Sequence, residues 1–130
     1  SPGEIITVKA YMNTEDSLVN GVELKTIYDP NVFEVTKLTK EQALKGLSQE
    51  IRNDIDNTLG IFQYSSFGLD KNLFLNGSNL LLFTLDVKVK ENAKPGVYTF
   101  DFDRSSTISA SGAGQNVFKE SVPQKITVSP

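Results

Sequence analysis

The chain has 130 residues, with 16 acidic and 13 basic side chains, and it contains no cysteine, histidine or tryptophan. This length suits one domain, residues 1–130, with a hydrophobic core of its own, and the missing cysteines exclude disulfides and thiolate metal sites. The net charge of −3 argues against a nucleic-acid partner, whose phosphates attract basic surfaces, and no apolar run approaches the length that membrane insertion requires.

Short segments in which apolar and polar residues alternate follow one another along the chain, which is the pattern of half-buried strands. Successive side chains of a strand point to opposite faces, so the apolar members of each segment mark its inner face. In chain order these inner residues are Ile6, Val8 and Ala10; Val22, Leu24, Thr26 and Tyr28; Phe62 and Tyr64; Leu81, Phe83, Leu85, Val87 and Val89; Tyr98, Phe100 and Phe102; and Ile126 and Val128. Leu82 belongs to the opposite, outward phase of its segment.

Residues that favour tight turns separate these segments, namely Asp29-Pro30-Asn31, Asn76-Gly77-Ser78 and Lys94-Pro95-Gly96. Many short strands separated by such turns predict an all-β protein, an antiparallel β-sandwich of about nine strands. The small, polar segment 105–114 is expected to be a flexible loop or an irregular edge strand.

One segment departs from the alternation and predicts a short helical turn near Lys40–Lys45. Thr39 is placed to cap it, Gln42 occupies the reciprocal position of a capping box, and Gly46 is placed to end it. After this turn, residues 51–55 predict a strand with Ile51 and Ile55 on one face and the charged residues Arg52 and Asp54 on the other.

The acidic residues of this region do not form a calcium-binding loop. Asp54, Asp56 and Thr58 have the first spacings of an EF-hand, but Leu59 stands where glycine is needed and Ser65 where a bidentate glutamate is needed. No metal site is therefore expected in this chain.

The sequence also gives no sign of catalysis. Ser65 and Ser66 have no histidine to activate them, and nothing in the pattern places two carboxylates across a cleft, as glycoside hydrolysis requires. The chain is expected not to be an enzyme.

Three landmarks resemble the cohesin family. The stretch from Asn20 to Val35 contains a strand that ends in Tyr28-Asp29-Pro30, the opening Pro2-Gly3-Glu4 is similar to the family's Pro-Gly-Asp motif, and the strand ending at Lys90 is followed by Pro95-Gly96. These landmarks come in the family's order and spacing and cover most of the chain.

The resemblance implies a jelly-roll topology and a non-catalytic module that binds a dockerin domain, tethering carbohydrate-active enzymes into a complex. It implies that the dockerin carries calcium and that this chain needs no cofactor. The module is expected to be a monomer when isolated and to belong to a larger secreted or cell-surface bacterial protein. The segment 40–53 matches the family less well, which leaves the class of dockerin open.

In cohesins the partner packs on one sheet face, made from the third, fifth, sixth and eighth strands. Carried over by position, the resemblance implies that the partner-binding residues are Gly21, Glu23, Lys25, Arg52, Asp54, Gln63, Ser65, Phe67 and Leu69. Burial of Phe62 and Tyr64 leaves Gln63 and Ser65 in solvent, whereas a one-residue slip would expose Phe62, Tyr64 and Ser66 instead.

Phe67 has two readings, an exposed interface anchor or a cap on the core at the end of a strand. Two other functions stay open. A carbohydrate-binding module would show an exposed line of aromatics, for which the candidates are Tyr11, Tyr64, Phe67 and Phe74. A structural spacer domain would show no concentrated anchor patch.

Overall fold

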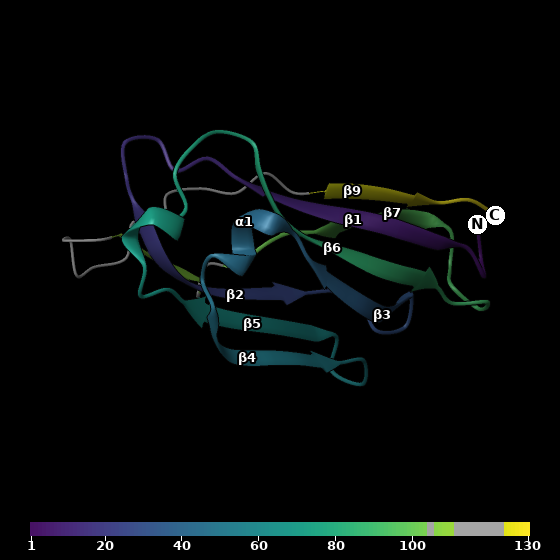
Figure 1. The fold of residues 1–130 in the computed structure, drawn as a ribbon. Helices are drawn as coiled ribbons and strands as arrows, with labels where there is room; N and C mark the ends of the chain where they lie inside the picture. The colour runs from purple at the N-terminus through teal and green to yellow at the C-terminus, as the bar shows by residue number, and fades with distance from the viewer. Residues whose placement is uncertain (104–105, 111–123) are drawn as a thin grey trace.

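The computed structural model describes residues 1–103, 106–110 and 124–130 (Figure 1). Within these residues the chain forms nine strands, one short α-helix and one 3-10 helix. The strands are β1 (Ile5–Met12), β2 (Val19–Ile27), β3 (Phe33–Lys40), β4 (Gln49–Asp56), β5 (Ile61–Phe67), β6 (Leu80–Val89), β7 (Gly96–Phe100), β8 (Thr107–Ala110) and β9 (Gln124–Val128). Helix α1 (Gln42–Lys45) follows β3, and η1 (Lys71–Leu73) follows β5.

The strands form antiparallel sheets that pack in two layers (Figure 1). One layer contains the sheet β1–β6–β3 together with the β7–β9 pair, and the other is the sheet β4–β5–β2–β8. The predicted all-β, antiparallel sandwich is therefore confirmed. Thr107–Ala110 form an edge strand beside β2, while the rest of the segment 105–114, apart from Ser106, lies outside the described residues.

The core lies between the inner faces that the alternation predicts. Leu24, Phe62 and Tyr64 of one sheet face Phe83 and Leu85 of the other, and all five are buried. The rings of Phe62 and Phe83 lie 5.6 Å apart. This apolar burial is the main stabilising term for a sandwich of this size.

Leu81 and Leu82 are corrections to the predicted faces. Leu82 is 1 % exposed although its phase points outward, whereas Leu81, predicted on the inner face, is not part of the core. The pairing of β6 with β1 shifts at this point, between Ala10 and Tyr11. Helix α1 packs on this part of β6, and Leu44 and Leu47 are buried with it. The backbone amide of Glu41 donates to the carbonyl of Leu82 at 2.8 Å, which holds the helix to the strand.

The helix itself is shorter than predicted. Thr39 belongs to β3, and Glu41 takes the N-cap position without a capping side-chain hydrogen bond. Gly46 follows the helix as predicted, but the reason is a close approach. A Cβ at this position would lie 2.2 Å from the carbonyl oxygen of Leu73, so only glycine fits without a shift of the backbone.

Asn57 joins the two sheets at one end of the sandwich. Its Oδ1 accepts hydrogen bonds from the Tyr28 hydroxyl at 2.5 Å and from the Val35 amide at 2.8 Å, while its Nδ2 donates to the Val35 carbonyl at 2.9 Å. Tyr28 follows β2 and Val35 lies in β3. Burial, with the charges of Asp56 and Glu34, raises the pKa of Tyr28 to about 12.

A second set of polar contacts closes the other end. The amide of Thr14 donates to the carbonyl of Gly77 at 2.9 Å, and the amide of Gly77 donates to the hydroxyl of Thr14 at 2.8 Å. Beside them, Val19 and Leu75 exchange two backbone hydrogen bonds of 2.9 Å. The loop before β6 is thus fixed to the start of β2.

Phe83→Ala is expected to lower the free energy of unfolding by about 3–5 kcal/mol, because the ring is 1 % exposed and contacts three other aromatic rings. Urea denaturation of both proteins measures the difference. A loss below about 1 kcal/mol would show that the ring contributes little to the core.

The raised pKa of Tyr28 predicts a loss of stability at high pH. The unfolded tyrosine ionises near pH 10 and the folded one near pH 12, so its contribution is complete below pH 10 and falls as the pH rises from 10 to 12. Tyr28→Phe removes this dependence. Between pH 10 and 11 the free energy of unfolding of the parent should therefore fall by about 1 kcal/mol more than that of Tyr28→Phe. Urea denaturation at several pH values measures the free energy of unfolding of both proteins. If it fell equally with pH in the parent and in Tyr28→Phe, the prediction would be wrong. The other tyrosines are present in both proteins, so their ionisation does not affect the comparison.

Candidate functional site

The pairing of β2 with β5 places most of the predicted residues on one outer face. Glu23 lies opposite Ser65, and Lys25 lies opposite Gln63. Residues directly opposite in an antiparallel pair share a face. Tyr64, which lies between Gln63 and Ser65 in sequence, is 1 % exposed. The predicted register of β5 is therefore confirmed, and the alternative register, shifted by one residue, is wrong.

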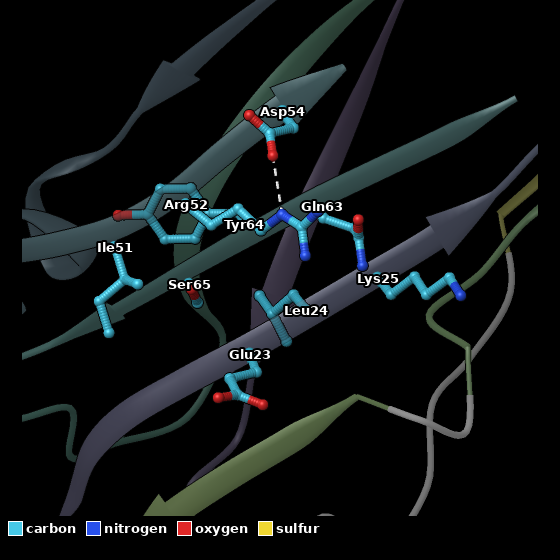
Figure 2. A pocket seen from close by; sticks show the side chains of 9 residues that line it. All are labelled: Glu23, Leu24, Lys25, Ile51, Arg52, Asp54, Gln63, Tyr64 and Ser65. Atoms are coloured by element: carbon cyan, nitrogen blue, oxygen red, sulfur yellow. Dashed lines mark hydrogen bonds and ion pairs between the residues drawn. The ribbon is translucent and has the colours of Figure 1, made fainter. Parts of the chain in front are cut away.

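Strand β4 adds the remaining charged residues, since Arg52 lies opposite Ser65 and Asp54 opposite Gln63. Together the three strands surround an open depression of about 440 Å³ (Figure 2). Its lining residues are Glu23, Leu24, Lys25, Ile51, Arg52, Asp54, Gln63, Tyr64 and Ser65. Of the predicted residues, Gly21, Phe67 and Leu69 do not line the depression: Gly21 lies opposite Phe67 at the end of the β2–β5 pair, and Leu69 follows β5.

The charges at the depression are partly paired. Arg52 donates from Nε to Oδ2 of Asp54 at 2.7 Å (Figure 2), and Oε2 of Glu23 accepts from the Thr107 hydroxyl of β8 at 3.2 Å. Both members of the Arg52–Asp54 ion pair are more than half exposed, so the pair adds little stability. These groups offer hydrogen-bond donors and acceptors to a protein partner.

Two predicted site residues are less accessible than expected. Ser65 was expected in solvent but is only 8 % exposed, because its short side chain lies between Glu23 of β2 and Arg52 of β4. Gly21, which has no side chain to project, is buried as well. Both residues therefore lie beneath the longer side chains of the outer face and present little surface to a partner.

Ile51 is a residue that sequence reasoning placed wrongly. It was expected on the face opposite Arg52 and Asp54, but it lines the same depression and is 68 % exposed. The cause is a β-bulge, since the pairing with β5 shifts between Glu50 and Arg52. All eight residues of β4 are exposed, and the high charge of this segment was the signal that it forms an edge rather than a buried strand.

Three exposed apolar residues lie at the end of β5, in the segment after it and in η1. Phe67 is 40 % exposed, Leu69 75 % and Leu73 53 %. Exposure of the ring favours the interface reading of Phe67 over the reading as a core cap, because a cap would be buried.

The acidic groups near the site support turns. Oδ1 of Asp56 accepts from the amides of Thr58 and Leu59, both at 3.0 Å, and Oδ1 of Asp70 accepts from the amide of Asn72 at 3.0 Å. In the described part of the chain, no three acidic, histidine or cysteine residues are grouped as a metal site would need. The same part contains no helix with the length and hydropathy to cross a bilayer.

These features define an antiparallel β-sandwich domain with one polar, slightly hollowed sheet face. A family model described as Cohesin domain matches residues 1–128, and the chain belongs to this family. Among curated proteins, none matches the chain.

Solved structures agree with this assignment. The chain is similar to CaCohA2 of Clostridium acetobutylicum, with a TM-score of 0.81, 18 % identity and coverage of 98 % of this chain and 83 % of that one. It is also similar to a chain of the Coh-OlpA–Doc918 complex, a type I cohesin–dockerin complex of Clostridium thermocellum, with a TM-score of 0.78, 18 % identity and coverage of 97 % and 89 %. The likeness confirms the predicted jelly-roll sandwich.

Proposed function

We propose that this chain is a non-catalytic module that binds a dockerin domain through the outer face of the β4–β5–β2–β8 sheet. The observation that carries the proposal is the convergence of the predicted residues Glu23, Lys25, Arg52, Asp54, Gln63 and Ser65, from three strands, around one depression. Similar structures support it, since CaCohA2 also occurs in a complex with CaDoc0917.

The sheet face suits a helical partner for a physical reason. Its side chains stand on strands held by a buried core, so little ordering entropy is lost on binding. It combines charged groups, hydrogen-bonding groups and the exposed Phe67 ring, a composition suited to a non-obligate interface of about 1,600 Å².

The setting of the module follows from the same proposal. The chain is one module of a larger secreted or cell-surface bacterial protein, is a monomer when isolated, and tethers carbohydrate-active enzymes that carry the dockerin. Calcium belongs to the dockerin, and this chain requires none.

The carbohydrate-binding alternative finds less support. Of its four aromatic candidates, Tyr64 is buried, and Tyr11 lies on β1, in the sheet opposite the one that carries Phe67. These rings therefore do not form the exposed line that a sugar platform needs. A spacer domain would not need the exposed apolar residues Phe67, Leu69 and Leu73 at the end of β5 and after it.

Calcium is expected to act through the partner alone. The thermal unfolding midpoint of this chain should be the same with calcium and with chelator, whereas binding to a dockerin should be lost in chelator. A rise of several degrees in the midpoint with calcium would contradict this, because a ligand specific for the native state must stabilise it.

Phe67→Ala is expected to weaken dockerin binding by about 2 kcal/mol or more, because an exposed ring at an interface serves as an anchor. Lys25→Ala should weaken it less, and mainly at low salt, because rim charges act through screened attraction. Isothermal titration calorimetry against each calcium-loaded dockerin encoded by the source organism measures both.

Asp86→Ala is the control, since Asp86 lies on β6 in the opposite sheet and its replacement should leave affinity unchanged. If Phe67→Ala and Asp86→Ala both bound as the parent does, the assigned face would be wrong. If the parent bound none of the dockerins, the proposed function itself would fail.

A further inference from the structure

Ile51 stands out on the surface of the proposed binding face. It is 68 % exposed, in a strand where the only other apolar residue is Ile55. The neighbouring positions of β4 are polar or charged, as an edge strand exposed to water requires. An exposed aliphatic side chain within the lining of a depression has surface to gain from burial by a partner.

The bulge explains how Ile51 reaches this position. The β4–β5 ladder pairs Glu50 with Ser66 and Arg52 with Ser65, so Ile51 has no opposite residue on β5. A bulge puts two residues of one strand opposite one of the other and redirects a side chain. Ile51 and Arg52 therefore both line the depression, although simple alternation would place them on opposite faces.

The surroundings of Ile51 leave room beside it. The Arg52 side chain extends toward Asp54, to which its Nε donates at 2.7 Å, and Figure 2 shows the guanidinium turned away from Ile51. Ser65, which lies opposite Arg52 and also lines the depression, carries one of the shortest side chains on the face. The part of the depression next to Ile51 thus has an aliphatic wall and a shallow floor.

We infer that Ile51 and Ser65 form a subsite for an aliphatic side chain of the dockerin partner. The inference rests on the proposed dockerin binding and adds to it a position that determines specificity. Glu23 lies across β5 from Arg52, opposite Ser65, and its carboxylate would repel an acidic side chain placed there. An aliphatic group makes van der Waals contact with Ile51 and releases water from both surfaces.

Three variants test the subsite by calorimetry against a dockerin that the parent binds. Ile51→Ala is expected to weaken binding about tenfold, by removing the wall, and Ser65→Leu at least as much, by filling the floor. Ile51→Val keeps the branched aliphatic group and should retain most of the affinity.

Ile5→Ala is the matched control, because Ile5 is 63 % exposed and lies on β1 of the other sheet. It should bind as the parent does. Ile51→Ala should also keep the parent's thermal midpoint, since an exposed side chain contributes little to the core, so a loss of affinity cannot be ascribed to unfolding. Ile51→Ala therefore tests the subsite even if Ser65→Leu fails to fold.

The outcomes separate this inference from the proposed function. If the parent binds a dockerin and Ile51→Ala binds it equally tightly, the subsite is wrong and the dockerin proposal stands. Equal weakening by Ile51→Ala and Ile5→Ala would also overturn the subsite, because the loss would not be specific to the face. A parent chain that binds no dockerin overturns both.

Discussion

The register of β2 against β5 is the constraint on which the candidate site depends. Leu24 lies opposite Tyr64, and both are buried against the other sheet. Because the side-chain period of a strand is two, a slip by one residue would exchange the core residues with those of the outer face. The free energy of burying Leu24, Phe62 and Tyr64 thus also determines that Glu23, Lys25 and Gln63 face outward together.

The separation of core residues from outward-facing residues explains how the fold is retained at 18 % identity to CaCohA2. The core requires apolar side chains of suitable volume at alternate positions, and many combinations satisfy that requirement. The outer face carries no such requirement, so its residues can change with the partner while the strands beneath stay in place. Folding and the proposed recognition of a partner therefore depend on different phases of the same strands.

The sequence could predict those parts of the structure that follow from local alternation. These parts include the inner faces of β2 and β5 and the turn after Tyr28, whereas the alternation left open whether Phe67 is exposed or caps the core. It could not predict Leu82, whose burial depends on α1 from elsewhere in the chain, or the shielding of Ser65 by its neighbours on β2 and β4. Ile51 was misplaced because a bulge has no signature in a simple period of two.

Asn57 follows β4, whereas Thr14 follows β1 and Gly77 precedes β6, and these ends of the strands lie at opposite ends of the sandwich (Figure 1). A pair of sheets fastened only by its core is free to fray from its ends, where local opening takes little free energy. Here the Asn57 contacts join β3 to the segment after β4 at one end, and the Val19–Leu75 bonds join the start of β2 to the segment before β6 at the other. Separation of the sheets at either end must therefore break hydrogen bonds as well as apolar contacts. Local opening at the ends of the sandwich is therefore expected to cost more free energy than it would in a sandwich held by its core alone.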